Sequence, residues 1–148
     1  AGLEATRVPA MRMRVARAGG VTLLDDAYNA SPQSMAAALE HLRHLPGRRY
    51  GAVLGDMLEL GAESEAAHHN VGRAAAWLDW LVTVGERARA FAAGAREGGL
   101  SSERIVCCKN AEEALAVVRD LVQAGDVVLV KASRAMGLEA VVQGVENA

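Results

Sequence analysis

The sequence is short of several features that mark whole classes of protein. It has two cysteines in 148 residues, and these are adjacent, Cys107 and Cys108. Neighbouring residues on a strand point to opposite faces of a sheet, so we expect two free thiols and a reducing compartment, the cytosol. No apolar run approaches the ~20 residues of a membrane span, and we see no charged-then-apolar signal peptide. These absences argue against a membrane protein and against a disulfide-stapled fold.

Basic charge and metal-ligand patterns are also lacking. Sixteen Lys and Arg stand against eighteen Asp and Glu, which gives a net charge of −2. That balance excludes the strongly basic surface of a general nucleic-acid binder but leaves room for a small anionic ligand. His68 and His69 are neighbours on a predicted helix and splay about 100° apart, so they do not form a zinc site. We predict no metal site in this chain and no nucleic-acid partner.

Two phosphate-binding signatures are missing as well. There is no G-x-x-x-x-G-K-[ST] loop, and no G-x-G-x-x-G follows a predicted strand. Without a loop that cradles phosphates, we expect that this chain does not hold a nucleoside triphosphate alone. Its 148 residues, of which 51% are hydrophobic and 23% charged, fit one globular domain by the prior of about 100–200 residues per domain.

Apolar runs of strand length alternate with segments of helical period along the chain. Near-continuous apolar strands are buried on both faces, which is typical of a parallel sheet covered by helices. An earlier strand over 13–18 ends at Gly19-Gly20, where a tight hairpin predicts an antiparallel edge. The later predicted strands are Val21–Leu24, Tyr50–Leu54, Trp80–Val84, Ile105–Cys108 and Val127–Val130. The predicted helices are Pro32–Leu45 with Ser31 as N-cap, Glu63–Leu78, Glu86–Arg96, Ala111–Gln123 and Arg134–Val145.

This order predicts an α/β fold. We expect a three-layer, Rossmann-like open sheet, mostly parallel with one antiparallel edge strand, built from about six strands and five helices over residues 1–148. In such sheets, ligands bind beyond the carboxyl ends of the strands. Polar segments follow the predicted strands there: 25–32, 55–61, 85–86 and 131–134.

Three ordered motifs among these segments carry a family resemblance. They are DDAYNASPQSM over 25–35, LGDMLELGAESEAAHHNVG over 54–72, and KASRAMGLE over 131–139. Together they resemble the C-terminal domain of the cell-wall Mur ligases, in the branch that joins D-alanyl-D-alanine to UDP-N-acetylmuramoyl-tripeptide. The resemblance spans nearly the whole chain.

The resemblance implies one domain of a three-domain cytoplasmic enzyme whose N-terminal and central domains are absent from this chain. In that family the N-terminal domain holds the UDP-sugar, and the central phosphate-loop domain holds ATP and magnesium. The tripeptide carboxylate becomes an acyl phosphate, which the amine of D-alanyl-D-alanine attacks to give an amide, ADP and phosphate. The C-terminal domain helps to bind ATP and dipeptide, so we expect no catalytic residue here and no activity of the chain alone.

On the nucleotide side the resemblance points to four residues. Arg12, ahead of the edge strand, would face the phosphates, because a guanidinium presents a fixed fork of donors to phosphate oxygens. Asp26 would contact the ribose, since a carboxylate accepts from both vicinal hydroxyls, and Tyr28 and Asn29 follow on the same turn. The residues alone also allow Arg12 to be a solvated surface arginine, and Asp26 to end a strand and pair with the dipole of the helix after Ser31.

On the dipeptide side, Lys131, Ser133 and Arg134 follow the last strand. Two cations and a hydroxyl suit the carboxylate of a dipeptide. The alternative is a helix that begins with Ser133 as its N-cap. Ala132 stands where Gly is common in the family, so either its φ is negative or the turn is strained.

A second dipeptide-side segment comprises Asp56, Met57, Glu59 and His68. The first three would form a substrate-side loop, with an acid available for the dipeptide ammonium. His68 matches a histidine of the family motif, although a helical histidine is more often a packing or surface residue, and Glu59 is equally explained as solvent-exposed.

Two other functions stay open on the sequence. The chain can belong to another amino-acid- or polyglutamate-adding ligase of the same superfamily, which substrate competition would separate from the dipeptide ligase. It can also be a stand-alone nucleotide-binding module, which predicts tight ATP binding without partner domains.

Overall fold

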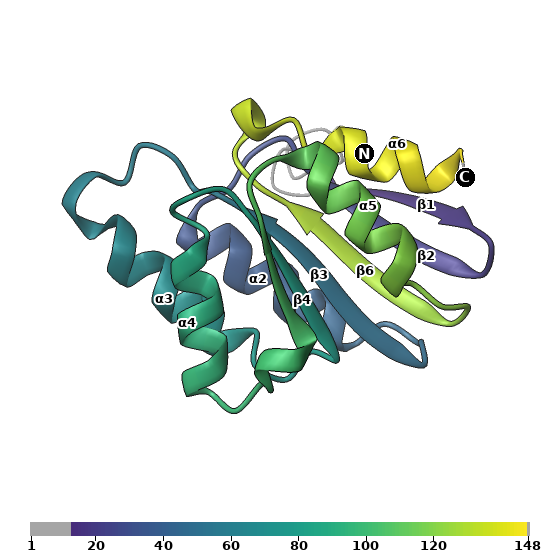
Figure 1. Cartoon of the computed structure of the whole chain (residues 1–148), viewed down its shortest axis with the longest axis horizontal. Helices are drawn as coiled ribbons and strands as arrows, with labels where there is room; N and C mark the ends of the chain where they lie inside the picture. The colour runs from purple at the N-terminus through teal and green to yellow at the C-terminus, as the bar shows by residue number, and fades with distance from the viewer. Residues whose placement is uncertain (1–12, 148) are drawn as a thin grey trace, which may run out of the picture.

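The computed structural model describes residues 13–147, which form a six-stranded sheet with helices on both faces (Figure 1). The strand order is β1-β2-β6-β3-β4-β5, antiparallel between β1 and β2 and parallel elsewhere. The predicted α/β class and antiparallel edge are therefore confirmed. The strands are β1 (Arg14–Ala18), β2 (Val21–Asp26), β3 (Arg49–Gly55), β4 (Trp80–Val84), β5 (Ile105–Cys108) and β6 (Asp126–Lys131).

The described residues hold five α-helices, of which four connect the strands and α6 follows β6. Figure 1 shows α5 and α6 in front of the sheet and α2 behind it. Short 3₁₀ turns precede three of the other elements: η2 (Gly61–Glu63), η3 (Ser102–Arg104) and η4 (Arg134–Met136). The α-helices are α2 (Pro32–Arg43), α3 (Ser64–Ala74), α4 (Arg89–Glu97), α5 (Ala111–Leu121) and α6 (Glu139–Glu146).

The sheet separates two hydrophobic cores, because successive side chains on a strand point to opposite faces. On β6, Val127 and Leu129 face the core under α2, α3 and α4, whereas Val128 and Val130 face the core under α5 and α6. Both faces are therefore covered, as the continuous apolar strands predict.

Helix α2 begins as predicted. The hydroxyl of Ser31 accepts a hydrogen bond from the Ser34 N–H at 3.1 Å, and the Ser34 hydroxyl accepts one from the Ser31 N–H at 2.9 Å. Pro32 occupies the first helical position, where its missing N–H costs no helical bond. This reciprocal cap sets the direction in which the chain leaves β2.

The last predicted helix, Arg134–Val145, is wrong at its start. Residues 134–136 form a single 3₁₀ turn, Gly137 lies in the left-handed region with φ 66°, and α6 begins only at Glu139. Ser133 is not a helix N-cap either, since its hydroxyl accepts from the N–H of Leu58 instead. The helical period continues through this segment, but a left-handed residue interrupts the helix.

A buried carboxylate anchors the amino ends of the central strands. Asp126, only 1% exposed, accepts two 2.8 Å bonds from the guanidinium of Arg49 on β3 and a third from the Gln123 N–H. The hydrogen bond to Asp126 raises the pKa of Arg49. This cluster supports the sheet at the end opposite to the ligand-binding edge that such folds use.

Candidate functional site

The carboxyl ends of β2, β6 and β3 lie side by side. Lys131, the last residue of β6, is level with Asp26 on β2 and with Leu54 on β3. The loops that follow these strands therefore gather at one edge of the sheet, where main-chain N–H groups are free to bind ligands. We call this edge the rim.

Lys131 joins two parts of the rim. Its Nζ lies 2.7 Å from Asp26 Oδ2 and 2.8 Å from the carbonyl oxygen of Asn29. The Lys131 side chain is 3% exposed and that of Asp26 is 15% exposed. A buried ammonium needs such partners, because leaving it unpaired away from water is costly. Lys131 thus ties β6 to β2 and to the turn after β2, and its ammonium points into the protein rather than toward solvent.

The turn after β2 also contacts the turn after β6. The guanidinium carbon of Arg134 lies 5.0 Å from the centroid of the Tyr28 ring, within the range of a cation–π contact. Tyr28 is 46% exposed, and the side-chain oxygen of Asn29 accepts from the N–H of Ala30. The structure therefore brings Tyr28 together with Arg134. Arg12 lies outside the described residues.

The loop after β3 is attached at each of its first three residues; we call residues 56–58 the 56–58 loop. The Asp56 N–H donates to the Val84 carbonyl at 3.2 Å, and the Asp56 carbonyl accepts from the Ser133 N–H at 3.0 Å. The Leu58 N–H donates to the Ser133 hydroxyl at 2.9 Å. These bonds fasten the 56–58 loop to β4 and to the turn after β6.

The Asp56 side chain turns toward α4. Its Oδ1 accepts a 2.7 Å bond from the Ala88 N–H, and its Oδ2 lies 3.5 Å from the Arg87 guanidinium. A Cβ at Gly85, where φ is +111°, would come within 2.5 Å of Asp56 Oδ1. Glycine is therefore required there on both counts. Asp56 is only 5% exposed, so its carboxylate serves the approach of α4 to β3.

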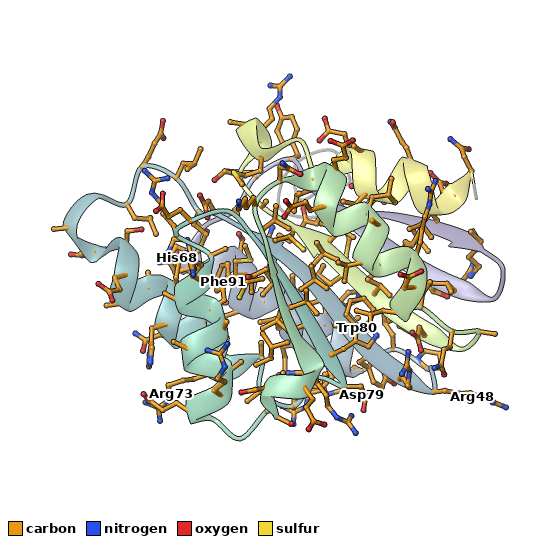
Figure 2. All side chains as sticks on the ribbon, viewed as in Figure 1. Arg48, His68, Arg73, Asp79, Trp80 and Phe91 are labelled. Carbon is orange, nitrogen blue, oxygen red and sulfur yellow. The ribbon has the colours of Figure 1, made fainter. Side chains whose placement is uncertain are left out.

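His68 on α3 also holds the 56–58 loop, through Met57. It is fully buried on α3, and its Nε2 accepts the Met57 N–H at 2.9 Å. Its Nδ1 lies 2.7 Å from the Ser64 carbonyl, so the hydrogen-bond pattern assigns the proton to Nδ1. The imidazole packs on Phe91 with ring centroids 4.8 Å apart, and the two side chains face each other between α3 and α4 (Figure 2). Met57 is also fully buried.

A hollow of about 570 Å³ lies beside this loop, between the starts of α3 and α4. Both acidic and basic side chains line this hollow, which we call the α3–α4 hollow. Sequence position predicts residues 85–86 at the rim, but no residue of this segment is among the predicted site residues. The signal that was available is a pair of arginines, Arg87 and Arg89, shortly after the carboxyl end of β4. The hollow is lined by Gly61, Ala62, Ser64, Glu65, Glu86, Arg87, Arg89, Ala90 and Ala93.

Two turn residues differ in backbone strain. Glu59 is exposed and has φ 67°, the single positive φ at a non-glycine residue in 13–147. Side-chain-bearing residues adopt this region at a cost, and such positions cluster at functional sites. Ala132, by contrast, does not have a positive φ, and a Cβ at Gly55 would meet its Cβ at 2.7 Å. The turn after β6 therefore has room for the Ala132 side chain, because Gly55, which faces it, has no Cβ.

The described residues offer no obvious place for a metal ion. Within 13–147, no three or more His, Cys, Asp or Glu side chains are grouped so that they could hold one. In the same range, no helix is both long and apolar enough to cross a bilayer.

The sequence matches the model of one known protein family. The family model described as "Mur ligase, glutamate ligase domain" matches residues 11–134. The chain therefore belongs to the Mur ligase family, and the region matched is the glutamate ligase domain of these enzymes.

Individual relatives show which enzymes of the family the chain is similar to. The chain is 42% identical to the UDP-N-acetylmuramoyl-tripeptide–D-alanyl-D-alanine ligase of Mycobacterium tuberculosis (strain CDC 1551 / Oshkosh), over 88% of the chain and 30% of that protein. It is 36% identical to the enzyme of the same name from Escherichia coli (strain K12), over 95% of the chain and 30% of that protein. The chain thus spans about a third of the length of these relatives.

A solved structure shares the fold. The MurF ligase from Thermotoga maritima, crystallised in complex with ADP, superposes with a TM-score of 0.77 at 32% identity. The match covers 92% of this chain and 30% of that one. The Rossmann-like architecture predicted from the sequence is confirmed by this similarity.

Proposed function

We propose that this chain is the C-terminal domain of an ATP-dependent ligase that adds D-alanyl-D-alanine to UDP-N-acetylmuramoyl-tripeptide in peptidoglycan precursor synthesis. The observation that carries the proposal is the identity of 36–42% to two ligases of that name over 88–95% of the chain. The γ-phosphoryl group of ATP passes to the tripeptide carboxylate, which releases ADP. The dipeptide amine then attacks the acyl phosphate, an amide forms and phosphate leaves.

The division of labour among domains is the one that the resemblance to the Mur ligases implies, and this chain is consistent with it. It has no phosphate loop, and residues 13–147 do not fit a Mg²⁺ site. ATP phosphates and magnesium then belong to a central domain and the UDP-sugar to an N-terminal domain, in an enzyme of the cytoplasm, where these substrates are made. The chain alone is inactive, and its rim closes over substrates held by the other domains.

We assign Asp26, Tyr28 and Asn29 of the rim to the nucleotide; Arg12, which lies outside the described residues, is assigned to the nucleotide phosphates by the family resemblance alone. Asp26 meets the ribose hydroxyls, for which a carboxylate is a suitable acceptor. The short contact with Lys131 at 2.7 Å supports this assignment, because it holds the carboxylate in one orientation before the nucleotide arrives.

The dipeptide side is the α3–α4 hollow together with the exposed turns around it. A dipeptide carries a carboxylate and an ammonium, and the wall of the hollow offers Arg87 and Arg89 for the first and Glu65 and Glu86 for the second. Arginine is suited to a carboxylate because its donors match both oxygens.

The remaining residues of the rim have different proposed roles according to whether their side chains are exposed or buried. Glu59 and Arg134 are exposed on the neighbouring turns, and we assign both to the dipeptide, with Arg134 also packing on Tyr28. The buried Lys131, Asp56, Met57 and His68, with the half-buried Ser133, shape the site from beneath.

A domain exchange tests this proposal. Residues 1–148 replace the matching segment of the Escherichia coli ligase, and the purified chimera is assayed for ATP-dependent joining of D-alanyl-D-alanine to the UDP-linked tripeptide. A parallel chimera with the Mycobacterium tuberculosis segment is the control for domain exchange itself. We expect product from both chimeras and none from the chain alone.

The same assay separates the other functions. An active control chimera beside an inactive one carrying residues 1–148 would refute the proposal. Preference of the chimera for a single amino acid over the dipeptide would indicate another ligase of the superfamily. Tight ATP binding by the chain alone, measured by calorimetry, would indicate a stand-alone nucleotide-binding module.

A further inference from the structure

His68 is a buried ionisable side chain that connects two parts of the rim. Its Nε2 accepts from the Met57 N–H in the 56–58 loop, and its Nδ1–H donates to the Ser64 carbonyl at the start of α3. Ser64 lines the α3–α4 hollow. One imidazole therefore links the loop after β3 to the wall of the hollow.

The bond to Met57 has no substitute nearby. Met57 and Phe91 are both 0% exposed, and among the described contacts the Met57 N–H has no acceptor other than His68. A buried N–H left without an acceptor costs much more than an average hydrogen bond contributes. The loop then gains by moving until that N–H finds water, and the His68 bond prevents this movement.

Movement of the 56–58 loop would alter the hollow through Asp56. The Asp56 carboxylate holds the Ala88 N–H at 2.7 Å and lies near the guanidinium of Arg87. Both residues belong to the segment that begins α4, and Arg87 lines the hollow. The arrangement of the hollow thus depends on a loop that His68 holds in place.

The ribose-facing carboxylate has other direct partners than His68 has, although the 56–58 loop also bonds to Ser133, two residues after Lys131. The Lys131 ammonium donates to Asp26 and to the Asn29 carbonyl, and none of these three residues bonds to His68 or Met57 among the described contacts. Loss of the His68 bond should therefore disturb the hollow more than the ribose-facing carboxylate.

We propose that His68 is a positioning residue for the acceptor dipeptide: it holds the 56–58 loop, and through Asp56 the Arg87 wall of the hollow, in the binding arrangement. The inference rests on the function proposed above. His68 does not touch the substrate, because it has no exposed surface.

The test uses the full-length ligase that contains this domain. His68→Phe keeps an aromatic ring against Phe91 but removes both hydrogen bonds, whereas His68→Gln retains an acceptor for the Met57 N–H. His69→Gln is the matched control, since His69 is the next residue and pairs only with the exposed Glu97 in the described contacts. Phosphate release gives kcat and the KM values for dipeptide and for ATP.

We expect His68→Phe to raise the KM for the dipeptide about tenfold, the factor for one unsatisfied buried N–H. The KM for ATP stays within about twofold because the Asp26–Lys131 contact is intact. His68→Gln recovers most of the dipeptide affinity, and His69→Gln behaves like the wild type. A parallel rise of both KM values, or no change in either, would overturn the positioning role.

A second measurement tests the proposal even where His68→Phe folds poorly. If the acceptor at position 68 holds the Met57 amide, hydrogen exchange of that amide is slow in the wild type and in His68→Gln and faster in His68→Phe. Equal exchange in the wild type and His68→Phe would count against the proposal. Failure of the proposed function has a different signature. A wild-type enzyme that uses another acceptor refutes the dipeptide assignment, and the KM for that acceptor then decides the role of His68.

Discussion

Replacing Lys131 by methionine distinguishes two roles for this residue. As a direct ligand of the dipeptide carboxylate, Lys131 would contribute to binding and little to folding. In the structure its ammonium bonds to Asp26 and to the Asn29 carbonyl, and 3% of its side chain is exposed. Lys131→Met keeps the apolar stem and removes only the charged end. We expect a loss of folding stability.

The magnitude follows from burial. Removing one partner of a buried ion pair costs about 3–5 kcal/mol, because the other charge is left unpaired. The Asp26 side chain keeps 15% exposure, so partial hydration lowers the expected cost to about 2–3 kcal/mol. For a domain of this size, each kcal/mol lowers Tm by about 2–4 °C, which predicts a fall of about 4–12 °C.

Thermal and urea unfolding of the chain measure this loss. Arg73→Met is the control, because the Arg73–Glu97 pair is exposed and 3.7 Å apart, and its removal should cost less than about 0.5 kcal/mol. Asp26→Asn should reduce the cost of Lys131→Met by more than about 1 kcal/mol in a double-mutant cycle. A cost below about 1 kcal/mol for Lys131→Met alone would contradict the anchoring role and return Lys131 to the list of substrate ligands.

Three further predictions concern single positions. Gly72→Ala should destabilise the chain by about 2 kcal/mol or more in urea unfolding, because its Cβ would lie 2.0 Å from the Phe91 carbonyl oxygen; an unchanged midpoint would contradict the α3–α4 contact. Glu59→Gly should not destabilise, whereas Glu59→Val should cost about 1–2 kcal/mol, since φ is 67°; equal effects would refute the strain. Burial raises the pKa of the Cys108 thiol, with smaller contributions from nearby ionisable groups, so its thiolate forms only at higher pH. Mass spectrometry of alkylated protein near neutral pH should find the exposed Cys107 modified first, and faster labelling of Cys108 would be the contrary result.

Local sequence patterns anticipate the fold well where one segment decides its own structure. Alternation of buried faces along β6, from Val127 to Val130, follows from a continuous apolar run in a covered sheet. The start of α2 follows from Ser31 and Pro32, which act within one turn. The start of α6 does not follow, because Ser133 bonds to a distant loop and Gly137 adopts a left-handed conformation.

The candidate site likewise has features that follow from position in the sequence and features that follow only from distant contacts. Position along the chain places Asp26, Lys131 and Ser133 after strands, hence at the rim, and the structure agrees. It does not say that Lys131 would be paired with an acid, nor that His68 would be buried beneath a loop. Arg87 escapes prediction because its neighbour across the hollow, Ser64, belongs to a different helix.

By itself, then, the sequence determined the layer order, the antiparallel edge, the family motifs and the end of the sheet at which we propose that ligands bind. These features depend on periodicity and on residues close in the chain. Tertiary structure alone decided the partners: Lys131 meets Asp26 across 105 positions, and Ser133 meets Leu58 across 75. The strand order β2-β6-β3-β4 brings these loops together, and a polar side chain's role depends on which groups burial leaves within hydrogen-bonding reach.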